Sequence, residues 1–200
     1  MTNFIKTLNR FNGNLCFAGD TDSGFIVFEA TTGGSLVYAS STKVVTGVCL
    51  IDESTYGVAF SDSFIGTFTS GVLDEAAINT GIGNVSEVVR ASNGAYYILD
   101  RVANELHKFT NPPATIVWTM ALPDEGHSSN GRIVLRESDG VIIYNDGRTV
   151  WTIRDDSTEG TLLSRTYFGA GSDLKVVVSG QQNPQYVRAR YKTVSGSELG

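Results

Sequence analysis

The chain has 200 residues, of which 41% are hydrophobic and 10% aromatic, and its net charge is −6. An acidic chain without a dense block of lysine and arginine argues against nucleic acid as the partner. No apolar run is long enough for a membrane span or a signal peptide, so we expect no membrane partner, no secretion signal and synthesis in the cytoplasm.

Five segments share one pattern, in which a turn separates two apolar runs. The turns lie near Gly24, near Gly57, at Asn93-Gly94, at Asp139-Gly140 and near Asn183-Pro184. Asn-Gly and Asp-Gly between apolar runs are strong signals for a β-hairpin, because glycine supplies the positive φ that a tight hairpin turn requires. The pattern predicts a repeat of about 40 residues in a single domain. In chain order the predicted units cover approximately residues 12–47, 48–84, 85–129, 130–172 and 173–200, with 1–11 left over.

Each of the first four units contains one or two further candidate strands after its hairpin. These are Ser35–Ala39, Phe64–Phe68, Glu105–Phe109 with Thr115–Met120, Thr149–Ile153, and Thr161–Phe168. We expect little helix, and the one candidate is Leu73–Asn79, where acidic residues precede two alanines.

The first two strands of most units are nearly continuous apolar runs. A strand has this composition when both of its faces are covered, whereas a sandwich strand alternates apolar and polar residues. The predicted fold is therefore an all-β, propeller-like ring of about five blades. Pairing of the N-terminal Phe4–Leu8 with the last unit would close this ring and cover an open edge. The alternative fold is a β-sandwich.

The third unit, residues 84–109, resembles the NHL class of propeller repeat. The match rests on the turn Asn93-Gly94, the pair Tyr96-Tyr97, Asp100 at the strand end and Asn104 in the next hairpin turn. Five units closed by an N-terminal strand are also similar to tachylectin-type propellers, which implies sugar binding as an alternative function.

Aromatic and basic residues are the candidates for binding. Trp118 and Trp151 each follow a valine, and an exposed tryptophan can stack on a sugar or anchor a protein interface. The alternative is that both pack between units. Arg188, Arg190 and Lys192 share one face of a late strand, where they would contact an acidic partner or prevent pairing with another strand edge.

The acidic residues, histidines and cysteines give little indication of chemistry. Asp20 and Asp22 alternate as in the start of a calcium loop, but a third acidic ligand is missing and the segment also fits a turn. The doublets Asp52-Glu53, Asp74-Glu75, Asp124-Glu125 and Asp155-Asp156 are expected to be solvated.

No cofactor motif, nucleophile elbow or histidine pair at metal spacing occurs, so we predict that the chain is not an enzyme. Cys16 and Cys49 occupy equivalent positions in neighbouring units and are expected to be buried free thiols.

The predicted function is an interaction module that docks onto protein subunits of a larger assembly, for example a virus particle. The alternative is a carbohydrate-binding propeller.

Overall fold

The computed structural model describes the backbone of residues 5–11, 14–21, 24–30, 33–123, 131–136, 138–146, 149–167, 175–178, 187–192 and 198–199. Side chains are described for Glu29 and, within these ranges, from residue 33 to residue 166. All regular structure in this part of the chain is β-strand. None of it forms a helix that could cross a membrane.

The strands form antiparallel sheets whose order follows the chain, with each strand paired to the next. The first sheet comprises β1 (Ile5–Phe11), β2 (Asn14–Thr21), β3 (Gly24–Ala30) and β4 (Leu36–Ser41). The second comprises β5 (Val45–Leu50), β6 (Thr55–Phe60), β7 (Phe64–Thr69) and β8 (Val72–Asn79). The third comprises β9 (Glu87–Arg90), β10 (Tyr96–Asp100), β11 (Glu105–Thr110) and β12 (Thr115–Ala121). The fourth comprises β13 (Arg132–Arg136), β14 (Val141–Asn145), β15 (Thr149–Asp155) and β16 (Gly160–Tyr167). The described part of the last sheet comprises β17 (Lys175–Val178), β18 (Val187–Lys192) and β19 (Glu198–Leu199).

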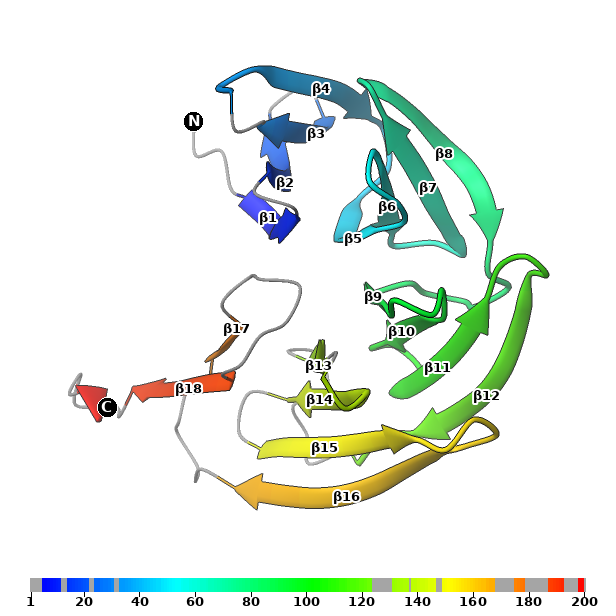
Figure 1. Ribbon diagram of the computed structural model, residues 1–200, viewed down its shortest axis with the longest axis vertical. Coiled ribbons are helices and arrows are strands. Elements are labelled where there is room, and N and C mark those ends of the chain that lie inside the picture. The colour runs from blue at the N-terminus through cyan, green and yellow to red at the C-terminus, as the bar shows by residue number, and fades with distance from the viewer. Residues whose placement is uncertain are drawn as a thin grey trace.

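The sheets are arranged around a common centre (Figure 1). In the second, third and fourth sheets the first strand lies toward the middle and the fourth strand lies outside. The two best-defined predicted turns are confirmed, because Gly94 has a φ of 90° and Gly140 a φ of 67°. L-amino acids with a side chain rarely adopt these angles, so glycine is favoured at both turns.

Among the residues whose side chains are described, three hydrophobic cores lie between successive sheets. Strand β10 contributes to two of them, because Tyr97 and Leu99 pack toward the fourth sheet while Tyr96 and Ile98 pack toward the second. Every residue of β10 and of β14 is buried. The apolar runs therefore do belong to strands covered on both faces, as predicted. A two-layer sandwich has a single core between its sheets, and the repeated cores contradict that alternative.

Two predictions about secondary structure are corrected. The segment Leu73–Asn79 is not a helix but lies in β8, which pairs with β7. Its alanines favour a helix only weakly, and burial of Ile78 in the core between the second and third sheets outweighs that preference. The segment Phe4–Leu8 was expected to pair with the last unit, but β1 pairs with β2 and is the first strand of the first sheet.

Candidate interaction surface

The exposed apolar side chains of the described chain lie mainly on the outermost strands of the first four sheets. Val72 on β8 is 70% exposed and Tyr38 on β4 is 61% exposed. The outermost strands carry seven such large side chains, namely Leu36, Tyr38, Val72, Ile116, Val117, Leu162 and Leu163. Where exposed apolar side chains gather into a contiguous patch, the patch often marks a contact surface.

Irregular strand pairing explains why adjacent apolar residues are exposed together. In β12, Ile116 pairs with Phe109 and Trp118 with Lys108, so Val117 is an additional residue between them. In β16, Leu163 is the additional residue, because Leu162 and Ser164 pair with consecutive residues of β15. Such a β-bulge interrupts the alternation of side chains across a strand. The pairs Ile116-Val117 and Leu162-Leu163 are consequently both exposed.

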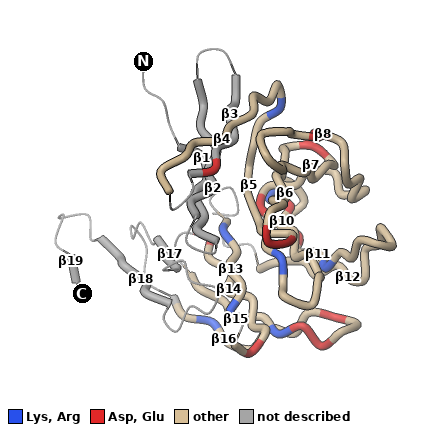
Figure 2. Tube along the Cα trace, turned by 45° about the horizontal axis from the view of Figure 1, so that its top comes forward, with Lys and Arg blue, Asp and Glu red and all other residues tan. Residues whose placement is uncertain are grey.

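The outer strands also carry few charges (Figure 2). Strand β12 has no charged residue, and the charges of β8 are those of Asp74 and Glu75. Depletion of charge around apolar side chains is a property of the cores of protein interfaces. We define the outer-strand surface as the seven exposed apolar residues named above.

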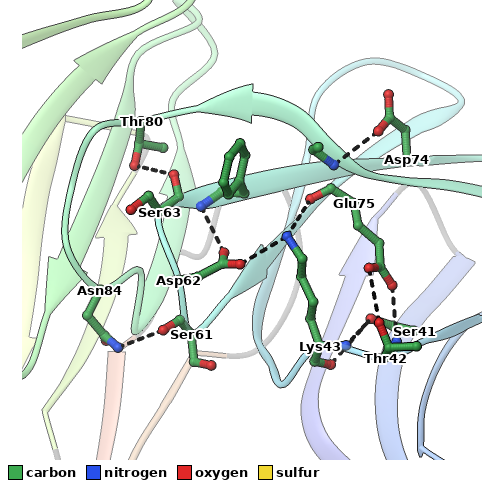
Figure 3. A network of polar contacts seen from close by, with 12 residues as sticks. Ser41, Thr42, Lys43, Ser61, Asp62, Ser63, Asp74, Glu75, Thr80 and Asn84 are labelled. Atoms are coloured by element: carbon green, nitrogen blue, oxygen red, sulfur yellow. Dashed lines mark hydrogen bonds and ion pairs between the residues drawn. The ribbon is translucent and has the colours of Figure 1, made fainter.

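Polar contacts fix the first sheet to the second. Figure 3 shows Lys43, which lies in the connection between β4 and β5, close to Asp62 and Glu75. The Lys43 ammonium is 2.9 Å from an Asp62 carboxylate oxygen and donates a hydrogen bond of 3.2 Å to the Glu75 carbonyl. It also lies 4.6 Å from the centre of the Phe64 ring, within the range of a cation–π interaction. The backbone N–H of Thr42 donates to Glu75 Oε1 at 3.1 Å. The residues that connect the two sheets are therefore held against the second one.

A carboxylate joins the third sheet to the fourth. Asp155 accepts hydrogen bonds from the Tyr97 hydroxyl at 2.8 Å and from Trp118 Nε1 at 3.0 Å. The ammonium of Lys108 is 2.6 Å from the same carboxylate. Burial alone would raise the pKa of Asp155, but the hydrogen bonds from Lys108, Trp118 and Tyr97 outweigh it and lower the pKa below its ordinary value. These contacts connect β12, which carries part of the outer-strand surface, to β15 of the next sheet.

A second charged cluster lies between the inner strands of the same two sheets. Glu87 Oε2 accepts a hydrogen bond of 2.8 Å from the Ile133 N–H and is 3.6 Å from Arg101 Nη2. Burial raises the pKa of Glu87. Burial and the nearby Arg132 lower the pKa of Arg101 to about 10. Arg101 also donates to the carbonyls of Gly131 and Ser86, at 2.5 Å and 3.1 Å, so it acts as a link between sheets.

The two tryptophans predicted as binding residues are buried. Trp118 is 6% exposed and lies 6.1 Å from the Tyr97 ring, measured between centroids. Trp151 is 1% exposed and stacks on Tyr144 at 5.3 Å. Binding by these residues requires exposed indole rings. Both rings instead pack in the core between the third and fourth sheets, which agrees with the alternative prediction that they pack between units. The valine-aromatic pairs therefore provide no exposed tryptophan platform for a sugar.

The other predicted site residues lie at the ends of the chain. Arg188, Arg190 and Lys192 lie on β18, where Arg188 pairs with Val177 and Arg190 with Lys175, but their side chains lie outside the described residues. Asp20 is part of β2, and its side chain and the whole of Asp22 are likewise outside them. Their roles remain predictions. Among the described residues no group of three potential metal ligands occurs.

Cys49 is a buried free thiol, as predicted. Burial raises the pKa of the Cys49 thiol to about 12, although Arg90 and a hydrogen bond from the Gly57 backbone act in the opposite direction. Cys16 lies on β2, and its side chain is outside the described residues.

The sequence reasoning missed two features of this surface. The doublet Asp155-Asp156 was expected to be solvated, yet Asp155 is the acceptor that joins two sheets. The apolar pairs Ile116-Val117 and Leu162-Leu163 were treated as ordinary strand residues. Adjacent apolar residues late in a repeat, where an outer strand is expected, are the signal that could have identified them.

No protein-family model and no curated protein sequence matches the chain. Solved structures do resemble it. The β-propeller domain of Cps50 (Swd1) from Myceliophteria thermophila is 13% identical with a TM-score of 0.70, over 98% of this chain and 71% of that one. A catalytically inactive virginiamycin B lyase from Staphylococcus aureus, solved with quinupristin, is 14% identical with a TM-score of 0.63, over 98% and 69% of the two chains.

A third similar structure comes from a nidogen/laminin complex. It is 12% identical with a TM-score of 0.63, over 99% of this chain and 79% of that one. Identities this low show the fold alone, and that fold is a β-propeller. The particular likeness to NHL and tachylectin-type repeats remains a prediction.

The prediction that this chain is not an enzyme is corrected by these comparisons. Virginiamycin B lyase is an enzyme and has the same fold. The absence of a familiar catalytic motif therefore does not exclude catalysis in a chain of this architecture.

Proposed function

We propose that the chain is a protein-interaction module that docks onto other subunits of a larger assembly through its outer-strand surface. The observation that carries this proposal is the recurrence of exposed apolar side chains on β4, β8, β12 and β16, the outermost strands of four sheets. The cores between the sheets are already filled by other residues, so these side chains are not needed to complete them.

A rigid support favours this role. Lys43 and Asp155 join successive sheets through contacts of 2.9 Å and 2.6 Å with Asp62 and Lys108. Side chains held on such a support lose little conformational entropy on binding, which favours affinity. One of the similar structures was solved in a nidogen/laminin complex, which supports protein binding by this fold. We extend the proposal to a virus particle assembled after synthesis in the cytoplasm, because a β chain rich in Gly, Ser, Thr and Asn is of a kind common in phage structural proteins.

Affinity isolation with matched variants tests the proposal. The wild-type chain would be immobilised and exposed to proteins from its source, and each captured protein would be purified and titrated against the wild type and the variants. Replacement of Ile116, Val117, Leu162 and Leu163 by serine should weaken binding of the captured partner at least about tenfold. The melting temperature should fall only modestly, because these side chains are 40–45% exposed and lie outside the cores between the sheets.

The matched control is Val102→Ser. Val102 is 82% exposed but lies in the turn between β10 and β11 rather than on an outermost strand. Its replacement should leave binding unchanged. Equal loss in the control and in the outer-strand variant, or full binding by both, would contradict the proposed surface.

A further inference from the structure

Strand β4 differs from the other outermost strands because its edge is regular. All six of its residues pair in unbroken register with β3, from Leu36 opposite Ala30 to Ser41 opposite Phe25. It ends the sheet in the order β1-β2-β3-β4. Its sequence, LVYASS, contains neither a charged residue nor proline.

The other three outermost strands carry features that oppose pairing with another chain. Each of β8, β12 and β16 has a register shift against its neighbour, at Ile65/Thr67, Lys108/Phe109 and Thr152/Ile153. Strand β8 adds two carboxylates and β16 adds Arg165. Bulges and charges are the usual means by which proteins protect an edge strand, and β4 has neither.

We propose that the β4 edge binds an extended segment of a partner protein, which pairs with Leu36–Ser41 as an additional antiparallel or parallel strand. This inference rests on the proposed function and specifies how one part of the outer-strand surface would be used. Backbone groups of alternate residues in an edge strand point away from the sheet, and an added strand satisfies them. Leu36 and Tyr38 then contact alternate side chains of the added segment.

The inner side of β4 holds the edge in position for pairing. Val37 and Ala39 pack against the core of the second sheet. The turn between β7 and β8 lies against this strand, because a Cβ built on Gly71 would be 3.1 Å from Val37 Cγ1 and 3.6 Å from the Tyr38 carbonyl oxygen. A strand fixed before binding loses little entropy when a partner adds to it.

The charges around this edge favour a basic segment. Glu75 accepts a hydrogen bond from the backbone N–H of Thr42, the residue that follows β4. The neighbouring cation, Lys43, is already in contact with Asp62. A segment that alternates apolar residues with lysine or arginine therefore complements both the side chains of β4 and the Glu75 carboxylate at the end of this strand.

A synthetic peptide tests this inference. The probe is acetyl-Lys-Val-Thr-Val-Lys-Val-Thr-amide, and amide NMR shifts of the full chain report binding. Saturable shifts should centre on Leu36–Ser41. The variant Leu36→Lys with Tyr38→Lys should bind at least about tenfold more weakly. The variant Val72→Lys, which places a charge at a more exposed site on β8, should have a smaller effect. Unchanged melting temperatures would show that the variants are folded.

A second peptide separates backbone pairing from simple apolar contact. The same sequence N-methylated at every residue keeps its charge and side chains but cannot pair as a strand, and it should not bind. Equal binding of both peptides, or shifts centred away from β4, would overturn the inference. Sedimentation gives a third outcome: dimerisation of the wild type that is lost in the Leu36→Lys, Tyr38→Lys variant would make the occupant a second copy and also overturn it.

The captured partner distinguishes failure of this inference from failure of the proposed function. Full binding by the β4 variant, together with loss in the variant of Ile116, Val117, Leu162 and Leu163, would reject strand pairing and leave the proposed function intact. Full binding by both variants would reject both proposals.

Discussion

Trp118 on β12 donates the hydrogen bond of its indole to Asp155, at the end of β15, over 3.0 Å. The two residues belong to different sheets and are far apart in the sequence. Tyr97 and Lys108 contact the same carboxylate from two further strands of the third sheet. One acidic residue therefore joins three strands of one sheet to the next, and its removal should affect the junction as a whole.

Replacement of Asp155 by alanine should lower the free energy of unfolding by about 2–4 kcal/mol, because it leaves three donors, one of them charged, without their acceptor in a largely buried site. Urea unfolding of both proteins measures the change. Asp156→Ala is the matched control, because Asp156 is exposed and contacts Arg154 on the surface. The control should leave the unfolding midpoint nearly unchanged. Similar midpoints for the two variants would show that Asp155 is not a structural link.

Stability should also depend on the protonation of His107. This side chain is buried, its Nδ1 is 2.9 Å from Thr119 Oγ1, and its Nε2 is 3.5 Å from Glu105 Oε2. Burial lowers the pKa of His107 below 6.5, against the opposing effects of Glu105 and Asp100. The unfolded state therefore binds the proton more readily than the folded state. The contribution of His107 to stability is complete above the pKa of the unfolded state, about 6.5. It is lost as the pH falls from that value toward the lower pKa of the folded state.

The measurement is the free energy of unfolding at pH 7.5 and at about pH 5, for the wild type and for His107→Gln. Glutamine can still hydrogen-bond to Thr119 but does not titrate. The pH-dependent change in the free energy of unfolding of the variant is subtracted from that of the wild type. This difference removes the contributions of the carboxylates, including that of Glu87, whose raised pKa favours the folded state on acidification. The wild type should lose more stability on acidification than the variant. An equal loss in both would mean that His107 titrates alike in the folded and unfolded states.

Much of the sheet structure could be predicted from the sequence because its determinants are local. The turns at Gly94 and Gly140 depend on a positive φ that adjacent residues signal directly. The continuous apolar runs of β10 and β14 correctly indicated strands covered on both faces. These signals depend only on residues within or next to the strand.

The errors concern features decided by distant residues. The segment Leu73–Asn79 resembles a helix start locally, but its pairing with β7 and the burial of Ile78 determine that it is a strand. The apolar segment Phe4–Leu8 could pair with either neighbour, and its composition does not specify which. Asp155 is indistinguishable from Asp156 by residue type, and only its position next to Lys108 and Trp118 separates their roles.

Two glycines without a positive φ provide a test of sheet packing. A Cβ built on Gly66 would be 2.6 Å from the Asp74 carbonyl oxygen and 2.8 Å from the Phe60 ring. Gly66→Ala should therefore force β7 and β8 apart and cost about 3 kcal/mol or more. A Cβ on Gly83 would meet a single atom, Asp100 Oδ2, at 3.9 Å.

Gly83→Ala, the control, should be neutral or slightly stabilising, since alanine restricts the unfolded chain. Thermal unfolding measures both changes. Equal midpoints for the two variants would contradict the close approach of β8 to Gly66.

Cys49 should be nearly inert to thiol reagents in the folded protein. Its side chain is 3% exposed, and its sulfur is close enough to Gly57 that a Cβ there would lie 2.8 Å from it. The thiolate is the reactive form, and burial raises the pKa of this thiol to about 12, so almost none forms at pH 8. The variant Cys16→Ser leaves Cys49 as the single thiol and allows its reaction to be followed alone. At pH 8 it should react with a disulfide reagent at least about a hundredfold more slowly in buffer than in denaturant. Rapid stoichiometric reaction in buffer, with the melting temperature of the variant unchanged, would mean that Cys49 is accessible and that the core around Gly57 opens readily.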